Sequence, residues 1–461
     1  MTIKFPSRLI FSAFSLALLA GCGDKTTDTS ENKQDSTVAG RAPVAMTAPK
    51  LEDTFKAEID ALSAHPQVKE AFQFIEDYDE QTIKTLITLT EIEAPPYKEK
   101  NRSDKYLSLL KEAGADSVWQ DEVWNAIGLV KGTKRGKVLA FCAHLDTVFP
   151  EGTDTRVQQS GDTLKAPGIS DDTRGLAILI TIMKAIRKSG IQPENDILFI
   201  GNVGEEGQGD LRGAKYLFGP NGPKIDAFIS VDGSGHESVT NQALGSHRYR
   251  ITFQGPGGHS WGAFGLGNPH HALGRAINYF TDEADKFTRS GPKTNYNVGV
   301  ISGGTSVNSI PFESIMEVDM RSESPESLVK VDTILQQAVR KALADQNKLK
   351  RHGPDLTVKI EMIGDRPSGE HPESMAIVQR GIAATQFVGG RPTLRRGSTD
   401  SNIPISKGIP AITIGGGGMG RNAHSLDEYF INKDGVLGIK RALLIVLAEV
   451  GIDDEMRIES R

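Results

Sequence analysis

Val138-Leu-Ala-Phe-Cys-Ala143 is a run of six apolar residues, and His144-Leu145-Asp146 follows it directly. A run without polar interruption is typical of a strand that is buried on both faces, as the inner strands of a parallel sheet are. Residues i and i+2 of a strand point the same way, so His144 and Asp146 leave its carboxyl end together. In open α/β sheets this edge binds ligands. A polar turn after a strand would carry the same three residues, and both interpretations stay open here.

Strands and helices alternate on both sides of this run. Asp196–Gly201 and Ile225–Val231 are predicted to be two more buried strands, and Arg174–Arg187 is predicted to be a helix. Further helices are predicted at Phe55–Asp77, Glu80–Glu91, Arg102–Ala113, Ser374–Gly381 and Val436–Glu449, with a last strand at Ala411–Ile414. The alternation predicts an α/β fold, a mostly parallel sheet with helices on both faces.

The pattern changes after residue 245. His247–Phe253 alternates polar and apolar residues, which is typical of a sheet with one solvent-exposed face. A helix, two strands, a helix and a strand are then predicted at Pro269–Phe287, Asn295–Gly303, Ile315–Arg321, Pro325–Asn347 and Leu356–Ile363. The order β-α-β-β-α-β is the ferredoxin-like plan. We therefore predict an α/β domain in two parts, residues 51–245 and 364–461, interrupted by an α+β domain at 246–363.

The composition is that of an ordinary globular protein. The 461 residues are 38% hydrophobic and 24% charged, which excludes collagen-like, coiled-coil and wholly disordered chains. The formal net charge of −6 gives no electrostatic footprint for a nucleic acid, so no such partner is expected. The two cysteines are too few for a disulfide scaffold. Cys142, in the apolar run, is expected to be a buried core residue.

The first 22 residues are predicted to be a targeting signal. Lys4 and Arg8 precede a short apolar stretch, Leu9–Ala20, which is shorter than the ~20 residues that span a membrane. The stretch ends in Leu-Ala-Gly-Cys22, which resembles a bacterial lipobox, whose cysteine is lipidated. A plain signal peptide with a chance cysteine is the alternative. We expect residues 23–50 to be a disordered tether, and the folded domain to lie in the cell envelope, on the periplasmic side, with the lipid anchor as its only membrane contact.

Acidic and imidazole side chains recur after the other predicted strands and at the start of a predicted helix. They are Asp171 and Asp172, Glu205 and Glu206, Asp232 and His424. The aspartate pair opens a helix, where acids also serve simply to complement the helix dipole. The glutamate pair is harder to explain as a turn, because turns favour Asn, Asp and Gly. Two imidazoles and several carboxylates at one sheet edge, without thiolates, favour zinc or a harder divalent ion. Two such ions about 3.5–4 Å apart need a carboxylate that bridges them.

Six segments make the pattern more specific. HLDTV, GISDDTRG, GEEGQG, SVDGSG, GGHSWG and NAHSLDE occur in this chain in the order seen in a large family of dinuclear metallohydrolases. The chain resembles this family from about residue 80 to 450. It includes peptidase T, glutamate carboxypeptidase, acetylornithine deacetylase and succinyl-diaminopimelate desuccinylase. The resemblance implies a catalytic metal-binding domain with an inserted ferredoxin-like dimerisation or lid domain, and hence a homodimer.

The matched motifs imply a set of metal ligands. His144 and Asp232 would hold one divalent ion, and Glu206 and His424 would hold the other, with zinc favoured for both. Asp171 would bridge the two ions, and in the family the peptide bond that follows it is cis.

The resemblance also implies roles around the metals. Asp146 would orient His144, and Glu205 would be the general base for a water shared by the two ions. His259 would stabilise the tetrahedral oxyanion, often in the neighbouring subunit's site. Asn308 and Arg321 match positions that hold the substrate's carboxylate. Taken alone, His259 would be a turn residue in a glycine loop, Asn308 a turn residue and Arg321 a surface arginine.

Two details point to a branch of the family. Asp232-Gly-Ser and Gly397-Ser-Thr-Asp-Ser-Asn402 are similar to the peptidase T and dipeptidase branch, which favours an aminopeptidase for small peptides, with two or three residues. The backbone amides of Gly416 and Gly417 would cradle a substrate carboxylate, unless their loop is simply flexible. Thr173-Arg174 departs from the family, where Lys commonly follows the aspartate pair.

Two other functions stay open. An N-acyl-amino-acid deacylase or a carboxypeptidase would use the same metals. A non-catalytic binding lipoprotein would lack a ligand or the base, and none is missing from this sequence.

Overall fold

The computed structural model describes residues 48–453. The predictions for the leader at 1–22, for Cys22 and for the tether as far as residue 47 lie outside the described residues. Lys50, the last residue of the expected tether, already contacts helix α9 (Ala376–Phe387), because the Gln379 amide donates to its carbonyl at 2.9 Å. Within residues 48–453 no helix is both long enough and apolar enough to cross a membrane.

The larger sheet is parallel at its centre and mostly antiparallel at its edges. Strand β3 (Val138–His144) lies between β6 (Asp196–Asn202) and β7 (Ala227–Val231), and β17 (Ala411–Ile414) follows β7; these neighbours all pair in parallel. The outer strands are β1 (Ser117–Gln120), β2 (Ala126–Val130), β8 (Ser238–Ala243), β15 (Gly369–Glu370) and β16 (Thr393–Gly397). Of these, β2 and β8 join the central strands antiparallel. The predicted α/β fold is confirmed.

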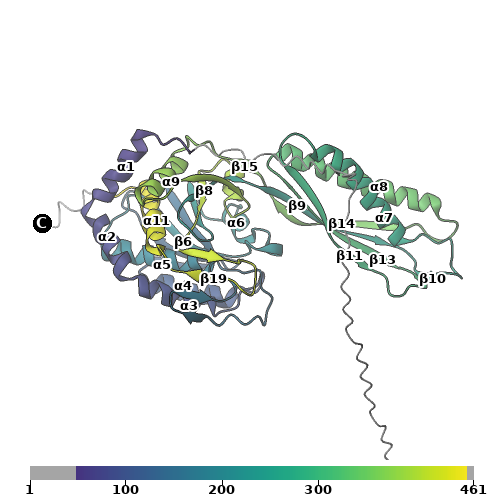
Figure 1. Cartoon of the computed structure of the whole chain (residues 1–461), viewed down its shortest axis with the longest axis horizontal. Helices are drawn as coiled ribbons and strands as arrows, with labels where there is room; N and C mark the ends of the chain where they lie inside the picture. Colours follow the sequence, from purple (N-terminus) through teal and green to yellow (C-terminus); the bar gives the residue numbers. More distant parts are fainter. Residues whose placement is uncertain (1–47, 454–461) are drawn as a thin grey trace, which may run out of the picture. The chain divides into compact units, whose positions relative to one another are not determined.

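Alternate residues of β3 explain why its whole sequence is apolar. Leu139 and Phe141 belong to the core on one face of the sheet, whereas Ala140 and Cys142 belong to the core on the other face. The first face is covered by longer helices: α1 (Asp53–Ala64), α2 (Pro66–Asp77), α4 (Lys100–Glu112), α5 (Thr173–Lys188), α9 and α11 (Gly435–Val450) (Figure 1). The second face is covered by the short helices α6 (Arg212–Leu217) and α10 (Asn402–Ser406). Cys142 is buried, as expected.

The helix predicted over Phe55–Asp77 is wrong as a single element. It is two helices, α1 and α2, which are separated at His65. His65 has ψ 132°, an extended conformation, because the ring of the following Pro66 disfavours the helical one. The predicted helix Glu80–Glu91 is present as α3 (Asp79–Thr90).

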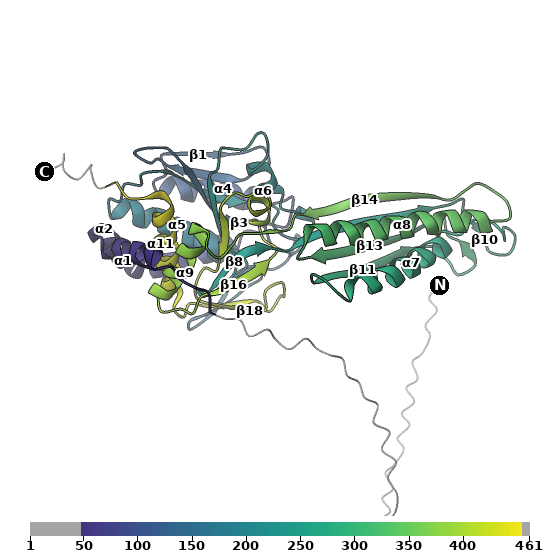
Figure 2. The ribbon, with the colours of Figure 1, turned by 90° about the horizontal axis from the view of Figure 1, so that it is seen from above.

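The inserted segment forms a sheet of its own. Its strands are β9 (Gly245–Gln254), β11 (Thr294–Gly303), β13 (Glu313–Ser322) and β14 (Thr357–Arg366), and its helices are α7 (Pro269–Thr288) and α8 (Pro325–Leu349). The strand order β11-β13-β9-β14, antiparallel throughout, is that of a ferredoxin-like domain, as predicted. Both helices run along the sheet (Figure 2), and residues such as Phe253, Phe280 and Leu335 form the core between them.

Candidate active site

The end of β3 is tied to the loop that follows β6. The carboxylate of Asp146 accepts the backbone N–H of Glu205 at 3.0 Å and that of Glu206 at 2.7 Å. His144 Nδ1 lies 2.9 Å from the carbonyl oxygen of Asp146, but 3.8 Å from its carboxylate. The carbonyl rather than the carboxylate therefore orients the imidazole, which corrects the expected contact. The Asp146 carboxylate instead holds the two glutamates in place.

Asp171 lies between two imidazoles. Its Oδ1 is 3.2 Å from Nε2 of His144, and its Oδ2 is 3.1 Å from Nε2 of His424. The peptide bond between Asp171 and Asp172 is cis, as the family resemblance implied. One carboxylate thus faces two potential metal ligands with two different oxygen atoms, which is the arrangement that a bridging ligand requires.

A glutamate from the last part of the chain holds the Asp171 loop. The carboxylate of Glu428 accepts the backbone N–H of Gly168 at 2.9 Å, of Ser170 at 2.8 Å and of Asp171 at 3.1 Å. A small antiparallel sheet brings the two loops together, since β19 (Tyr429–Ile431) pairs with β5 (Thr163–Lys165). The sequence placed Glu428 in a motif but gave no sign of this contact.

The remaining acids complete the cluster. His424 Nε2 is 2.8 Å from Oε1 of Glu206, and ligand atoms of His144, Asp171 and Glu206 all lie within 4.8 Å of one another. Hydrogen bonds with Asp171 and then with Glu206 raise the pKa of His424 to about 10. Burial, and next the charge of Asp171, raise the pKa of Asp232 to about 7. The neighbouring carboxylates therefore favour positive charge within the cluster. The imidazole and carboxylate donors of the cluster fit a divalent cation.

Glu205 forms a buried ion pair that the sequence analysis missed. Arg366 Nη1 donates to Oε1 of Glu205 at 3.0 Å and to Oγ of Ser398 at 3.1 Å, while its Nη2 donates to the Glu205 carbonyl. Both side chains of the pair are buried. Burial raises the pKa of Glu205 well above its usual value, and the charge of Arg366 opposes that rise. Arg366 ends β14, so the inserted domain supplies this contact.

The predicted residues of the inserted domain lie elsewhere. His259, on the exposed strand β10 (Gly258–His259), accepts the backbone N–H of Trp261 at its Nδ1 at 3.2 Å. Asn308 accepts the hydroxyl of Ser306, and Arg321 donates to Asp319 at 2.9 Å. Across residues 48–453, no hydrogen bond or ion pair joins these three residues to the cluster around Asp171.

The prediction that the backbone amides of Gly416 and Gly417 cradle a substrate carboxylate is wrong, because both amides already have partners. Their N–H groups already donate to the carbonyls of Gly233 and Gly235, at 2.9 and 2.8 Å. Gly417 has φ +73°, and a Cβ there would lie 2.6 Å from the carbonyl oxygen of Gly435. Gly417 thus allows close packing against the start of α11, and a Cβ at Gly416 would lie 2.6 Å from the Ile178 side chain of α5.

Comparison with known proteins identifies the family. The model of peptidase family M20/M25/M40 matches residues 140–448, more than half of the chain. This chain belongs to that family. The M20/M25/M40 peptidase is 24% identical to carboxypeptidase G2 of Pseudomonas sp. (strain RS-16) over 366 residues, which cover 74% of this chain and 82% of that relative.

Two solved structures share the fold of this M20/M25/M40 peptidase. Aminopeptidase PepT from Bacillus cereus ATCC 10987 is 18% identical with a TM-score of 0.63, covering 80% of this chain and 98% of that one. The Bacillus subtilis YXEP protein, described as a dinuclear metal binding peptidase from the M20 family, is 16% identical with a TM-score of 0.57; the match covers 82% and 100% of the two chains. These identities are low, so the two likenesses establish the fold alone.

Proposed function

We propose that this M20/M25/M40 peptidase hydrolyses the N-terminal peptide bond of di- and tripeptides at a centre of two divalent ions, with zinc favoured. The position of Asp171 between His144 and His424 carries the proposal, because each of its oxygens faces a different imidazole. Asp232 would complete the site of His144, and Glu206 would complete that of His424. Two divalent ions bound there supply Lewis acidity toward the peptide carbonyl and make a nearby water more acidic.

Glu205 would move the proton in this reaction. Its carboxylate would accept a proton from the attacking water and deliver one to the nitrogen of the leaving amine. The protein holds Glu205 at its backbone and at its side chain. Asp146 accepts the backbone N–H of Glu205, and Arg366 donates to the Glu205 carboxylate. A base fixed in this way needs no reorganisation when the substrate arrives.

The substrate specificity rests on the family branch. The motifs favour a peptidase T-like aminopeptidase, whereas the sequence match with carboxypeptidase G2 favours cleavage at the other end of a peptide. The decisive experiment is release of free amino acids by the full chain from Ala-Ala, Leu-Gly-Gly, N-acetyl-Leu-Gly-Gly and N-acetyl-leucine, with zinc and then with a chelator. Chelator-sensitive cleavage that requires a free amine supports the aminopeptidase. Cleavage of the blocked peptide from its carboxyl end would establish a carboxypeptidase. Cleavage of the N-acetyl amino acid alone would establish a deacylase. No cleavage of any substrate would favour the binding protein.

We also propose a homodimer formed through the inserted domain. Strand β11 is an edge strand of its sheet, and its Val300 and Ile301 side chains are 46% and 59% exposed. An apolar edge of this kind is a template for pairing with a second copy. In such a dimer His259, Asn308 and Arg321, which do not contact the cluster of their own chain, would serve the partner's site. Light scattering should show a dimer that Ile301→Asp converts to monomer; a monomeric native chain would refute the proposal.

Arg366→Ala is expected to lower kcat about ten- to a hundredfold while KM and the metal content stay nearly unchanged, because the Glu205 carboxylate loses its ion-pair partner. The arginine lowers the pKa of Glu205, so its removal raises that pKa. Since the base must be ionised, the acidic limb of the pH–rate profile should move to higher pH. Arg366→Lys should restore part of the rate. An unchanged pH profile in a folded Arg366→Ala variant would contradict this role.

Metal binding is expected to release protons. In the metal-free protein His424 is protonated at pH 7, because its pKa is about 10, and Asp232, with a pKa of about 7, is about half protonated. Ligands must lose these protons to bind a cation, so the apparent zinc affinity should rise with pH up to about pH 10, most steeply below about pH 7. Calorimetry in buffers of different ionisation enthalpy counts the released protons. Heats that do not depend on the buffer would argue against this ligand set.

A further inference from the structure

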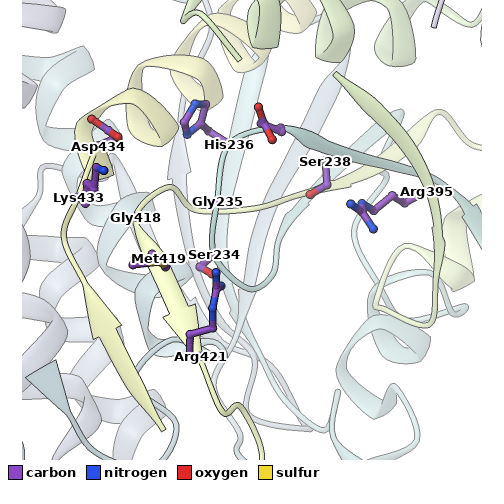
Figure 3. A pocket seen from close by; sticks show the side chains of 11 residues that line it. Ser234, Gly235, His236, Ser238, Arg395, Gly418, Met419, Arg421, Lys433 and Asp434 are labelled. Atoms are coloured by element: carbon purple, nitrogen blue, oxygen red, sulfur yellow. The ribbon is translucent and has the colours of Figure 1, made fainter. Parts of the chain in front are cut away.

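A cavity of about 630 Å3 opens between the loop that follows β7 and the hairpin that carries His424. Its walls include Ser234 and Ser238, from the segment that follows β7. They also include three cations from the later part of the sequence, Arg395, Arg421 and Lys433. Figure 3 shows Lys433 and Arg395 on opposite sides of the cavity, with Arg421 between them in this view. A cavity of this size accommodates a small ligand.

The cations of this cavity are not neutralised. Throughout residues 48–453, no carboxylate lies within ion-pair distance of Arg395, Arg421 or Lys433. Among the described residues, the Arg421 guanidinium makes one hydrogen bond, from Nη1 to the carbonyl of Gly420 at 2.9 Å. Two carboxylates also line the cavity, and one of them, Glu237, accepts the backbone N–H of Arg391 at 3.1 Å. An excess of positive charge in a chain of net charge −6 gives this cavity an electrostatic preference for anions.

The cavity adjoins both halves of the proposed metal centre. Ser234 lies two residues after Asp232, and Arg421 lies three residues before His424. At ~3.5 Å per residue, these side chains start within about 7 and 11 Å of the two ligand residues. Two to three residues of an extended peptide span the same distance, so a peptide bound at the cluster is long enough to reach the cavity.

We propose that this cavity is a subsite for an acidic residue of the peptide substrate, whose side-chain carboxylate lies among Arg395, Arg421 and Lys433. The proposal rests on the proposed peptidase function and deepens it, because it names the substrate class. Guanidinium groups suit carboxylates through their paired N–H donors, and the partly open cavity keeps the attraction sensitive to salt.

The test compares peptides that differ in one charge. Full-length protein loaded with zinc is given Ala-Ala-Ala and its variants with Glu or with isosteric Gln at each position, and kcat/KM is measured. At one position Glu should exceed Gln about tenfold, and the ratio should fall as salt is raised. The double variant Arg395→Gln/Lys433→Gln, at two exposed positions, should bring the ratio to about one and leave the Gln peptide unaffected. The control Lys69→Gln/Lys111→Gln removes two exposed lysines from α2 and α4, and should keep the preference.

The outcomes separate the subsite from the peptidase function. If Ala-Ala-Ala is cleaved but Glu never exceeds Gln, the subsite is refuted and the peptidase stands. If no peptide is cleaved, calorimetric titration of the same Glu and Gln peptides decides the subsite. Tighter binding of the Glu peptide that Arg395→Gln/Lys433→Gln abolishes supports the subsite, and equal affinities overturn it.

Discussion

Replacing Glu205 by Gln is expected to lower kcat at least about a hundredfold and to leave the metal content unchanged. Gln has nearly the same shape, and its side-chain oxygen still accepts a hydrogen bond from Arg366, but it cannot take a proton from water. The backbone N–H of residue 205 continues to donate to Asp146, so the loop and the neighbouring Glu206 should stay in place. The loss should therefore appear in kcat rather than in zinc binding.

The experiment measures steady-state rates together with metal content by elemental analysis. Glu112→Gln, an exposed position at the end of α4, is the matched control and should keep full activity. Near-native turnover of the Glu205→Gln variant would remove Glu205 as the base. A variant that has lost its metal would instead show that Glu205 mainly supports the ligand loop.

Asp171→Ala is expected to reduce the bound zinc from two ions to at most one per chain and to lower kcat/KM at least about a thousandfold. The substitution removes the oxygen that faces His144 and the oxygen that faces His424 at once. Losing one of two paired ions removes several kcal/mol of charge stabilisation, and about 4 kcal/mol corresponds to a thousandfold in rate.

Asp427→Asn is the matched control, because this exposed aspartate lies in the loop of His424 and pairs with Lys165 at 2.7 Å. An exposed pair contributes about 0–1 kcal/mol, so metal content and rate should hardly change. Two tightly bound ions in the Asp171→Ala variant would exclude a bridging role for Asp171.

Local sequence patterns predicted the central strands and the fold class of this protein. The apolar run at Val138–Ala143 is a central strand because both of its faces are covered, and β13 alternates because one of its faces is wet. The outer strands β1 and β8 were missed because polar residues interrupt them, so neither the run nor the alternation is clear. β8 pairs with β15, β16 and β17, which are distant in the sequence, whereas β1 pairs with the nearby β2.

Contacts between residues that are distant in the sequence could not be predicted from local patterns. Arg366 is the last residue of β14, beside Pro367, and nothing local indicates that it reaches Glu205, 161 residues earlier. The glycine-rich sequence suggested that the backbone amides of Gly416 and Gly417 are free to bind substrate. In the fold these amides donate to the carbonyls of Gly233 and Gly235. Motifs thus gave the residue types at the sheet edge, while the packing of distant segments determines what each group is free to do.

The contact between Glu428 and the Asp171 loop has a consequence for biosynthesis. A chain emerging from the ribosome presents His144, Asp171 and Glu206 long before it presents His424 and Glu428. Until then the loop that carries Asp171 lacks the carboxylate that accepts three of its N–H groups, and the second imidazole is missing. A nascent chain is therefore an incomplete metal binder for most of its synthesis. Premature termination before residue 424 would leave a fragment with the acids of the centre but without the groups that organise them.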